Sequence, residues 1–463
     1  MIAPTAKMGF SAYELPSLHS SKVSVGGPMI TTLPLLQKVD GVLPKADPNK
    51  ILKLSYADLQ VSGWQTPQLR HASIYHSADL CNVRLPLADL DKILKRIPLC
   101  LRAMSIQANY KDDPVSAVLL TLEDIEFHLC LWKSRTEQDI VNVEIQRRRG
   151  DAVLSSRYAQ KILKAIQIQD FQEDDYQVDT SLNIRHLQDA ESLLQQVLAS
   201  SSASSGPYKG LSSSEQTVMV LDTVHSYLHT ERLDARHLGL ESLCILTDPR
   251  RTSIATSISC ARAVLLGEAP TEDSKAICGY LHKFVMRLVQ LREFGDENFG
   301  LADPMDVDSE AETFFPSDDE GESLECKRPP EYVEYMSQLF RLALTAMINS
   351  IEVVACFKDL EPLCHGNLVT MTHDFIASAK EICEQDMLQT LVDCVARAKY
   401  KQHNAYLATK GLRYLSQASP AVHLRLVKDF NVVKLVEEAA QTGYTRHALL
   451  QSEGEQLFRV LAL

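Results

Sequence analysis

The stretch that decides the fold class is Leu238–Thr247, which reads Leu-Gly-Leu-Glu-Ser-Leu-Cys-Ile-Leu-Thr. It is matched position for position by Leu407–Ser416, Leu-Ala-Thr-Lys-Gly-Leu-Arg-Tyr-Leu-Ser, with leucine at the same three places. The two copies are offset by 169 residues, close to four units of about 42 residues. Gly454–Leu461 is a looser third copy. Similarity at a fixed period predicts stacked helical repeats, in which neighbouring units supply each other's core.

The matched stretches also predict which side chains lie inside. Four leucines are expected to occupy equivalent core positions: Leu243, Leu246, Leu412 and Leu415. Truncating a buried leucine to alanine costs about 2–5 kcal/mol of stability. The polar neighbours Glu241 and Lys410 are expected to lie outside the core, where substitutions cost little.

From about Gln216 onward the apolar residues follow helical spacing, outside one acidic run. A small residue, Leu-x-x-Leu, a Ser or Thr with a polar turn, and a basic-apolar helix such as Leu424–Val436 together resemble an armadillo repeat. The resemblance implies an α-solenoid with a concave surface that binds partners. The asparagines that usually line the groove in that family are absent at matching positions, which argues against clamping of a peptide backbone. An irregular helical domain with coincidental leucine spacing is the alternative.

The acidic run lies between Glu293 and Glu325, where thirteen carboxylates occur without one Lys or Arg. It accounts for the whole formal charge of −13, so the rest of the chain is formally neutral. Like charges repel and keep a backbone solvated, which predicts an acidic disordered insertion. Ser309 and Ser317 are followed by carboxylates and are candidate phosphorylation sites for acidophilic kinases.

A second folded unit precedes the helical part. A helix is predicted from Leu85 to Leu101, because its apolar residues recur at spacings of three and four. Four strands are then predicted from alternation at 106–110, 115–122, 125–132 and 141–146. Gly150 and Asp151 are interpreted as a turn glycine and a helix-capping aspartate, and a second helix follows to about residue 168.

The order of helix, four strands and helix, with Gly-Asp before the last helix, resembles the kinase-associated domain found at the C-terminus of several protein-kinase families. That resemblance implies docking on anionic lipid headgroups or on a neighbouring domain through a basic face. The residues that could form such a face are Arg147, Arg148, Arg149, Arg157, Lys161 and Lys164. The triple arginine could equally be a solvated edge that discourages strand addition. No kinase motif accompanies the module.

The predicted fold class is α+β: a small four-stranded antiparallel module followed by an all-α, armadillo-like solenoid that an acidic disordered segment interrupts. The predicted boundaries are a disordered tail over 1–50, the α+β module over 51–168, a helix and Ser-rich linker over 169–215, helical repeats over 216–292, the acidic linker over 293–328 and helical repeats over 329–463.

Candidate reactive residues are few. Asp222, His225 and His229 share one helix face, but nothing in the sequence is placed to complete a metal site, so they are interpreted as a partly exposed histidine pair. Cys364, His365 and His373 are interpreted as loop residues, because a Cys/His catalytic pair needs an orienting partner. No catalytic motif is found, and we expect no enzyme activity, no cofactor and no metal.

The composition indicates the compartment of the protein and excludes some classes of partner. An odd number of cysteines, eleven, without a C-x-x-C pair indicates buried thiols in a reducing compartment. The most apolar stretch, Leu339–Phe357, contains Arg341, Asn349 and Glu352, so it is interpreted as a buried helix and no transmembrane segment is predicted. Neutral folded regions beside an acidic run argue against a nucleic-acid partner. The expected location is the cytoplasm, with the nucleus as the alternative.

These observations favour a non-catalytic scaffold or adaptor that binds other proteins through its helical surface. The sequence does not identify the partner. The alternative is a peripheral membrane protein that docks on anionic phospholipids through the basic face of residues 85–168.

Overall fold

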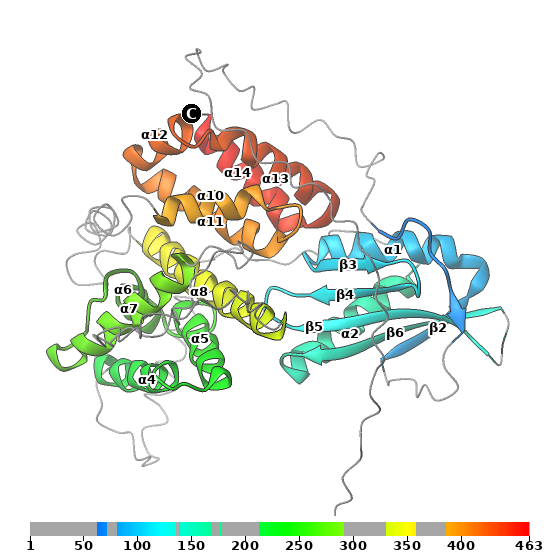
Figure 1. Cartoon of the computed structure of the whole chain (residues 1–463), viewed down its shortest axis with the longest axis horizontal. Coiled ribbons are helices and arrows are strands. Elements are labelled where there is room, and N and C mark those ends of the chain that lie inside the picture. Colours follow the sequence, from blue (N-terminus) through cyan, green and yellow to red (C-terminus); the bar gives the residue numbers. More distant parts are fainter. Residues whose placement is uncertain are drawn as a thin grey trace, which may run out of the picture. The chain divides into compact units, whose positions relative to one another are not determined.

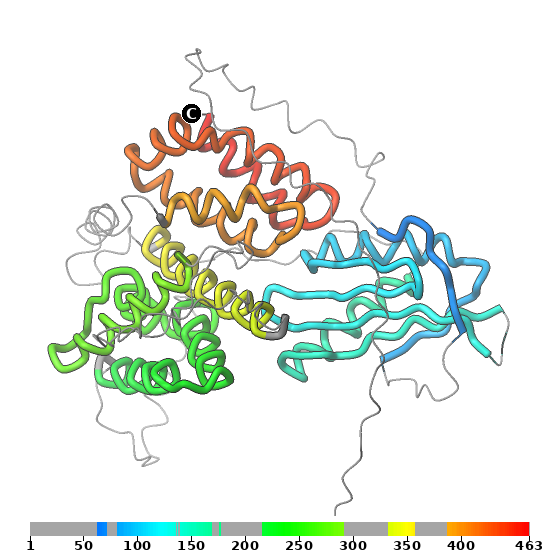
Figure 2. Tube along the Cα trace, in the orientation of Figure 1, coloured from blue at the N-terminus to red at the C-terminus, as the bar shows by residue number. Residues whose placement is uncertain are grey.

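The computed structural model describes residues 63–71, 81–135, 137, 139–168, 176, 213–290, 330–357 and 386–462 (Figure 2). Several predictions lie outside these residues: the tail over 1–50, most of the helix and linker over 169–215, and the acidic segment over 293–328.

The first folded unit, which we call the sheet module, is built on a mixed sheet with strand order β2-β6-β5-β4-β3; β1 pairs in parallel with β5, and all other pairs are antiparallel (Figure 1). Its strands are β1 (Arg70–His71), β2 (Asn82–Pro86), β3 (Gln107–Lys111), β4 (Ser116–Leu120), β5 (Glu126–Lys133) and β6 (Ile140–Arg149). Its helices are the short 3₁₀ turn η3 (Leu87–Asp89), α1 (Leu90–Ala103) and α2 (Ala152–Gln167).

One face of the sheet forms the core of this module. Phe127, Leu129 and Leu131 alternate along β5 and are almost completely buried, because successive side chains of a strand point to opposite faces. They belong to one apolar cluster with Ile97 of α1 and Ile162 of α2. The two helices therefore cover the face on which the apolar residues gather.

The start of the module differs from the sequence prediction. Residues predicted to begin the first helix instead form β2, in which Leu85 pairs with Val141 of β6. The helix proper begins at Leu90. The apolar residues before Leu90 fit both a helix and a half-buried strand, and pairing with β6 decides in favour of the strand. The four predicted strands are confirmed.

The junction between β6 and α2 is as interpreted from the sequence. Gly150 has a φ of 99°, and a Cβ there would lie 2.9 Å from the Cα of Ile125. Asp151 is the N-cap of α2, and its Oδ1 accepts a hydrogen bond from the backbone N–H of Leu154 at 2.7 Å. Capping of this kind satisfies a backbone donor that the helix itself cannot satisfy.

The rest of the described chain, which we call the helical region, contains ten α-helices and no strand. They are α4 (Ser213–Leu228), α5 (Leu233–Thr247), α6 (Ile254–Leu266), α7 (Lys275–Gln290), α8 (Pro330–Phe357), α10 (Asp386–Ala396), α11 (Gln402–Ala418), α12 (Pro420–Lys428), α13 (Val432–Arg446) and α14 (Ala448–Leu461), with a 3₁₀ turn η5 (Glu272–Ser274) before α7 (Figure 1). All ten contribute to one continuous apolar cluster. The α+β fold class is therefore confirmed, and the packing is compatible with a helical repeat.

The matched stretches lie on α5 and α11, and both helices pack against α8. Leu243 and Leu412 are completely buried and Leu415 is nearly so. Leu246 is only partly buried, although it packs against the same cluster. The first leucines of the two stretches differ more in burial: Leu238 is 47% exposed, whereas Leu407 is 8% exposed.

The long helix α8 lies in the interior of the helical region. Its segment Tyr332–Cys356 is the one described stretch long and apolar enough to cross a membrane by length and composition, and 72% of that window is buried inside the protein. Its polar side chains have partners: Arg341 pairs with Asp124, and the Asn349 amide donates to the Cys244 carbonyl at 3.3 Å. These features are those of a core helix.

Candidate functional site

The six basic residues singled out from the sequence do not share one surface. Arg147 and Arg148 are neighbours near the end of β6, where the pairing with β5 is irregular and Arg148 has no partner residue. Arg147 donates to the Gly150 carbonyl at 2.8 Å, and Arg148 lies 3.3 Å from His128 Nδ1. Arg149 is turned inward and pairs with carboxylates of its own module.

The other three, Arg157, Lys161 and Lys164, are brought together by α2. Their spacing of four and three residues places them in one row on the helix surface. All three are exposed. No ion pair or hydrogen bond to their side chains is found in the part of the chain that the structure describes. We call this set the basic row.

The basic row lines an open groove of about 440 Å³. The other residues of its wall are Glu123, Leu154, Tyr158 and Gln160. The Tyr158 hydroxyl donates to Glu123 Oε2 at 2.8 Å, which holds the ring in place. Burial, together with the nearby Glu123 charge, raises the pKa of Tyr158, so the phenol stays protonated. The groove thus has three cations along one edge and a carboxylate on its wall.

The residue after Glu123 links the sheet module to the helical region. Asp124, at the turn between β4 and β5, has a φ of 61° and is 5% exposed. Its carboxylate pairs with Arg341 of α8 and with Arg149 Nη2 at 3.3 Å. His237 Nε2 of α5 lies 3.4 Å from Oδ2 without a hydrogen bond, and burial lowers the pKa of this histidine. Burial lowers the pKa of Arg341 to about 10, which still leaves the guanidinium charged at neutral pH. Two guanidinium groups and one histidine ring therefore surround one buried carboxylate.

A second link is a chain of hydrogen bonds through two buried histidines. The backbone N–H of Leu450 donates to His447 Nδ1 at 3.1 Å, and His447 Nε2 lies 3.0 Å from His403 Nδ1. His403 Nε2 lies 2.7 Å from the Leu120 carbonyl of β4. A carbonyl only accepts, so His403 Nε2 carries a hydrogen, and the chain closes when His447 Nε2 donates to His403 Nδ1. Both rings are then neutral, with every nitrogen satisfied.

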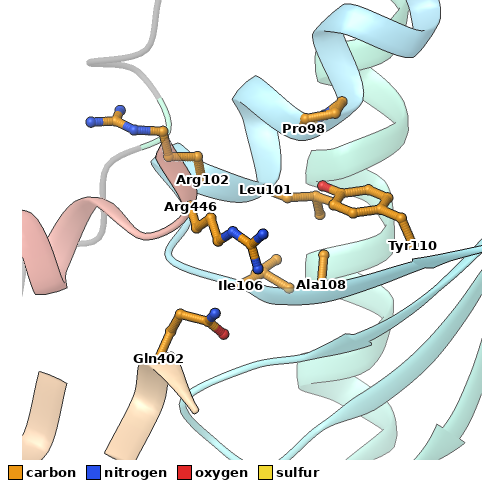
Figure 3. A pocket seen from close by; sticks show the side chains of 8 residues that line it. All are labelled: Pro98, Leu101, Arg102, Ile106, Ala108, Tyr110, Gln402 and Arg446. Carbon is orange, nitrogen blue, oxygen red and sulfur yellow. The ribbon is translucent and has the colours of Figure 1, made fainter. Parts of the chain in front are cut away.

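Arg102 of α1 makes a third link. Its guanidinium donates to the Tyr444 carbonyl and to Gln451 Oε1, each at 2.5 Å. Beside it, where Gln402 and Arg446 face α1 and β3, lies a cavity of about 20 Å³ (Figure 3). That volume is about one water molecule. This cavity is therefore too small to hold a substrate or cofactor.

Lys410 is buried, although the sequence predicted that it lies outside the core. The residue is 5% exposed, and its Nζ lies 2.8 Å from Glu352 Oε2 on α8. Arg250 and the Tyr414 hydroxyl also bond this carboxylate, at 3.2 and 3.3 Å. Burial opposes the charge, but Tyr406 and Glu352 outweigh it and raise the pKa of Lys410. Lys410 occupies a buried position because its charge pairs with the buried carboxylate of Glu352.

Among the described residues, no group of three or more His, Cys, Asp or Glu side chains is placed to hold a metal ion, the histidine pair on α4 included. The rings of His225 and His229 stack with centroids 5.6 Å apart, and His225 meets the Tyr280 ring edge-on at 4.8 Å. Three other candidates, Cys364, His365 and His373, lie outside the described residues, as do Ser309 and Ser317.

The links between the two units were not predicted from the sequence. Arg341 and Glu352 are the one local indication of them, because a charge inside an apolar helix needs a partner. Their partners lie on other elements, at positions that no local pattern indicates. Comparisons with known proteins found no matching family model, no matching curated protein and no matching solved structure.

Proposed function

We propose that this chain is a non-catalytic adaptor that binds other proteins through the surface of its helical region, used in the manner of an armadillo-like solenoid. The supporting observation is a concentration of exposed apolar side chains. Nine large apolar residues are exposed in the described part of the chain. Five of them are on the α4–α5 hairpin: Met219, Val220, Leu233, Leu238 and Ile245.

Two of these define a face. Leu238 and Ile245 are seven residues apart on α5, so they lie on the same side of that helix. They are 47% and 42% exposed. Single exposed leucines are common, but gathered apolar side chains favour an interaction surface. Leu243, on the opposite side, already supplies the core contact.

Three cysteines of the helical region are not candidate nucleophiles. Burial raises the pKa of Cys244 and of Cys260 to about 12. Because the thiolate is the nucleophile, these side chains are unreactive at neutral pH. Burial also raises the pKa of Cys278, to about 11.

The proposal is tested by affinity capture with the full-length chain as bait. The double variant Leu238→Glu/Ile245→Glu should lose the co-purifying proteins that the parent retains. The matched control is Val118→Glu/Leu424→Glu, which changes two apolar residues of similar exposure elsewhere. Circular dichroism and the melting temperature verify that both variants fold. Equal capture by parent and α5 variant would exclude this face as the binding surface.

The membrane alternative has weaker support. With Arg149 paired to carboxylates and with Arg147 and Arg148 contacting Gly150 and His128, it depends on the basic row alone. Each cation near an anionic membrane contributes about 1 kcal/mol before screening. Three such contributions give marginal attraction, and stable anchoring of a peripheral protein takes a second signal.

A further inference from the structure

We propose that the groove beside α2 binds an extended acidic segment of a partner protein, with Arg157, Lys161 and Lys164 contacting its carboxylates. This surface is separate from the apolar face on α5, so the inference does not depend on that face.

Within the described residues no carboxylate pairs with the basic row. Some other exposed cations are paired, such as Arg70 with Asp113 and Arg232 with Asp234. Three unpaired cations beside a concave surface produce a local positive potential, which attracts anionic groups. The groove is also within the size range of ligand pockets, about 300–1,000 Å³.

The spacing of the basic row matches that of an extended chain. The helix rises about 1.5 Å per residue, which separates Arg157 from Lys161 by about 6 Å and Lys161 from Lys164 by about 4.5 Å along its axis. An extended chain rises about 3.3 Å per residue, so side chains at alternate positions are about 6.6 Å apart and point the same way. Carboxylates at alternate positions of such a segment can therefore follow the row.

The wall of the groove favours a chain over a flat surface. Leu154 and Tyr158 give it an apolar surface, and the bond to Glu123 fixes the tyrosine ring. Glu123 repels anions on its own side, so an acidic segment is held with its carboxylates toward α2. A flat bilayer would bring headgroups to the carboxylate as well as to the cations. A chain that follows one edge avoids that repulsion.

The test measures fluorescence anisotropy of a labelled octapeptide of alternating glutamate and serine, titrated with the full-length protein at low salt. Because the whole chain carries a formal charge of −13, non-specific attraction of an acidic peptide is not expected. Binding therefore reports a local site. The same peptide with glutamine in place of glutamate should not bind. The triple variant Arg157→Gln/Lys161→Gln/Lys164→Gln should weaken binding about tenfold or more, since exposed ion pairs contribute modestly but add up.

The charge-matched control is Lys95→Gln/Lys275→Gln/Lys283→Gln, which removes three exposed lysines outside the groove. It should change the affinity less than about twofold. Circular dichroism verifies folding of both triple variants. The proposal is overturned if the parent does not bind the glutamate peptide, or if the two triple variants lose affinity equally. It is also overturned if phosphatidylserine vesicles, but not the peptide, bind in a way that requires the basic row.

Discussion

Lys410 and Glu352 form an ion pair inside the helical region, and both residues are almost completely buried. Replacing Lys410 with Met leaves the carboxylate with Arg250 and Tyr414 as partners and should lower the free energy of unfolding by about 3 kcal/mol. Glu241→Gln, at the matched position of α5 where the side chain is 43% exposed, should change it by less than about 0.5 kcal/mol. Urea unfolding of both variants measures the difference. Equal effects would mean that the buried pair contributes nothing.

The buried histidines His403 and His447 should make the stability of the protein depend on pH. Burial lowers the pKa of His403 to about 3 and that of His447 well below its ordinary 6.5. The unfolded chain therefore binds two more protons than the folded chain once the pH falls below about 6.5. The contribution of the two neutral histidines to stability is complete above about pH 6.5 and is lost as the pH falls toward 3. Lowering the pH from 7.5 to 5.5 should therefore reduce the free energy of unfolding by about 2–3 kcal/mol through these two residues.

The control for this pH effect is the double variant His403→Gln/His447→Asn. Asparagine can still cap the N-terminus of α14, where His447 accepts from Leu450. The variant should lose most of the difference between pH 7.5 and 5.5. A smaller dependence remains, because burial also lowers the pKa of His128, His225 and His237. An unchanged difference would assign the whole effect to other groups.

At the scale of elements, α5 and α11 carry the matched leucines but are not equally packed. Leu412→Ala should cost about 2–5 kcal/mol, because the side chain is completely buried. Leu246→Ala should cost about 1 kcal/mol, because part of that side chain is already solvated. Thermal and urea unfolding of the two variants measure the difference. Equal and large costs would support the simple register expected from the sequence.

The same elements show what the sequence could predict. Alternation in β5 and β6 and the Gly150–Asp151 junction are local patterns, so the strands and the start of α2 were predictable. β2 was not, because its assignment depends on pairing with a strand far along the chain. The candidate site likewise has one part that local sequence patterns predict and one part that they do not. The basic row follows from helical spacing, whereas the inward turn of Arg149 depends on Asp124 at another turn.

At the scale of the whole described molecule, we expect Asp124 to couple the stability of the sheet module to that of the helical region, because its carboxylate contacts Arg341 of α8. The chain has two tryptophans, and both Trp64 and Trp132 lie in the sheet module. Tryptophan fluorescence therefore reports the unfolding of that module, while far-ultraviolet circular dichroism reports mainly the helices. In the parent protein the two signals should change at the same urea concentration, because the buried links couple the units.

Asp124→Ala should separate the two transitions. The substitution leaves Arg341 buried without its carboxylate, which costs about 3–5 kcal/mol. Arg341→Met alone should also destabilise, but the double variant should cost clearly less than the sum, because no unpaired charge remains at that contact. Glu437→Ala, an exposed carboxylate on α13, is the control and should leave the transitions coincident. Coincident transitions in Asp124→Ala, together with additive single and double variants, would show that this carboxylate does not hold the two units together.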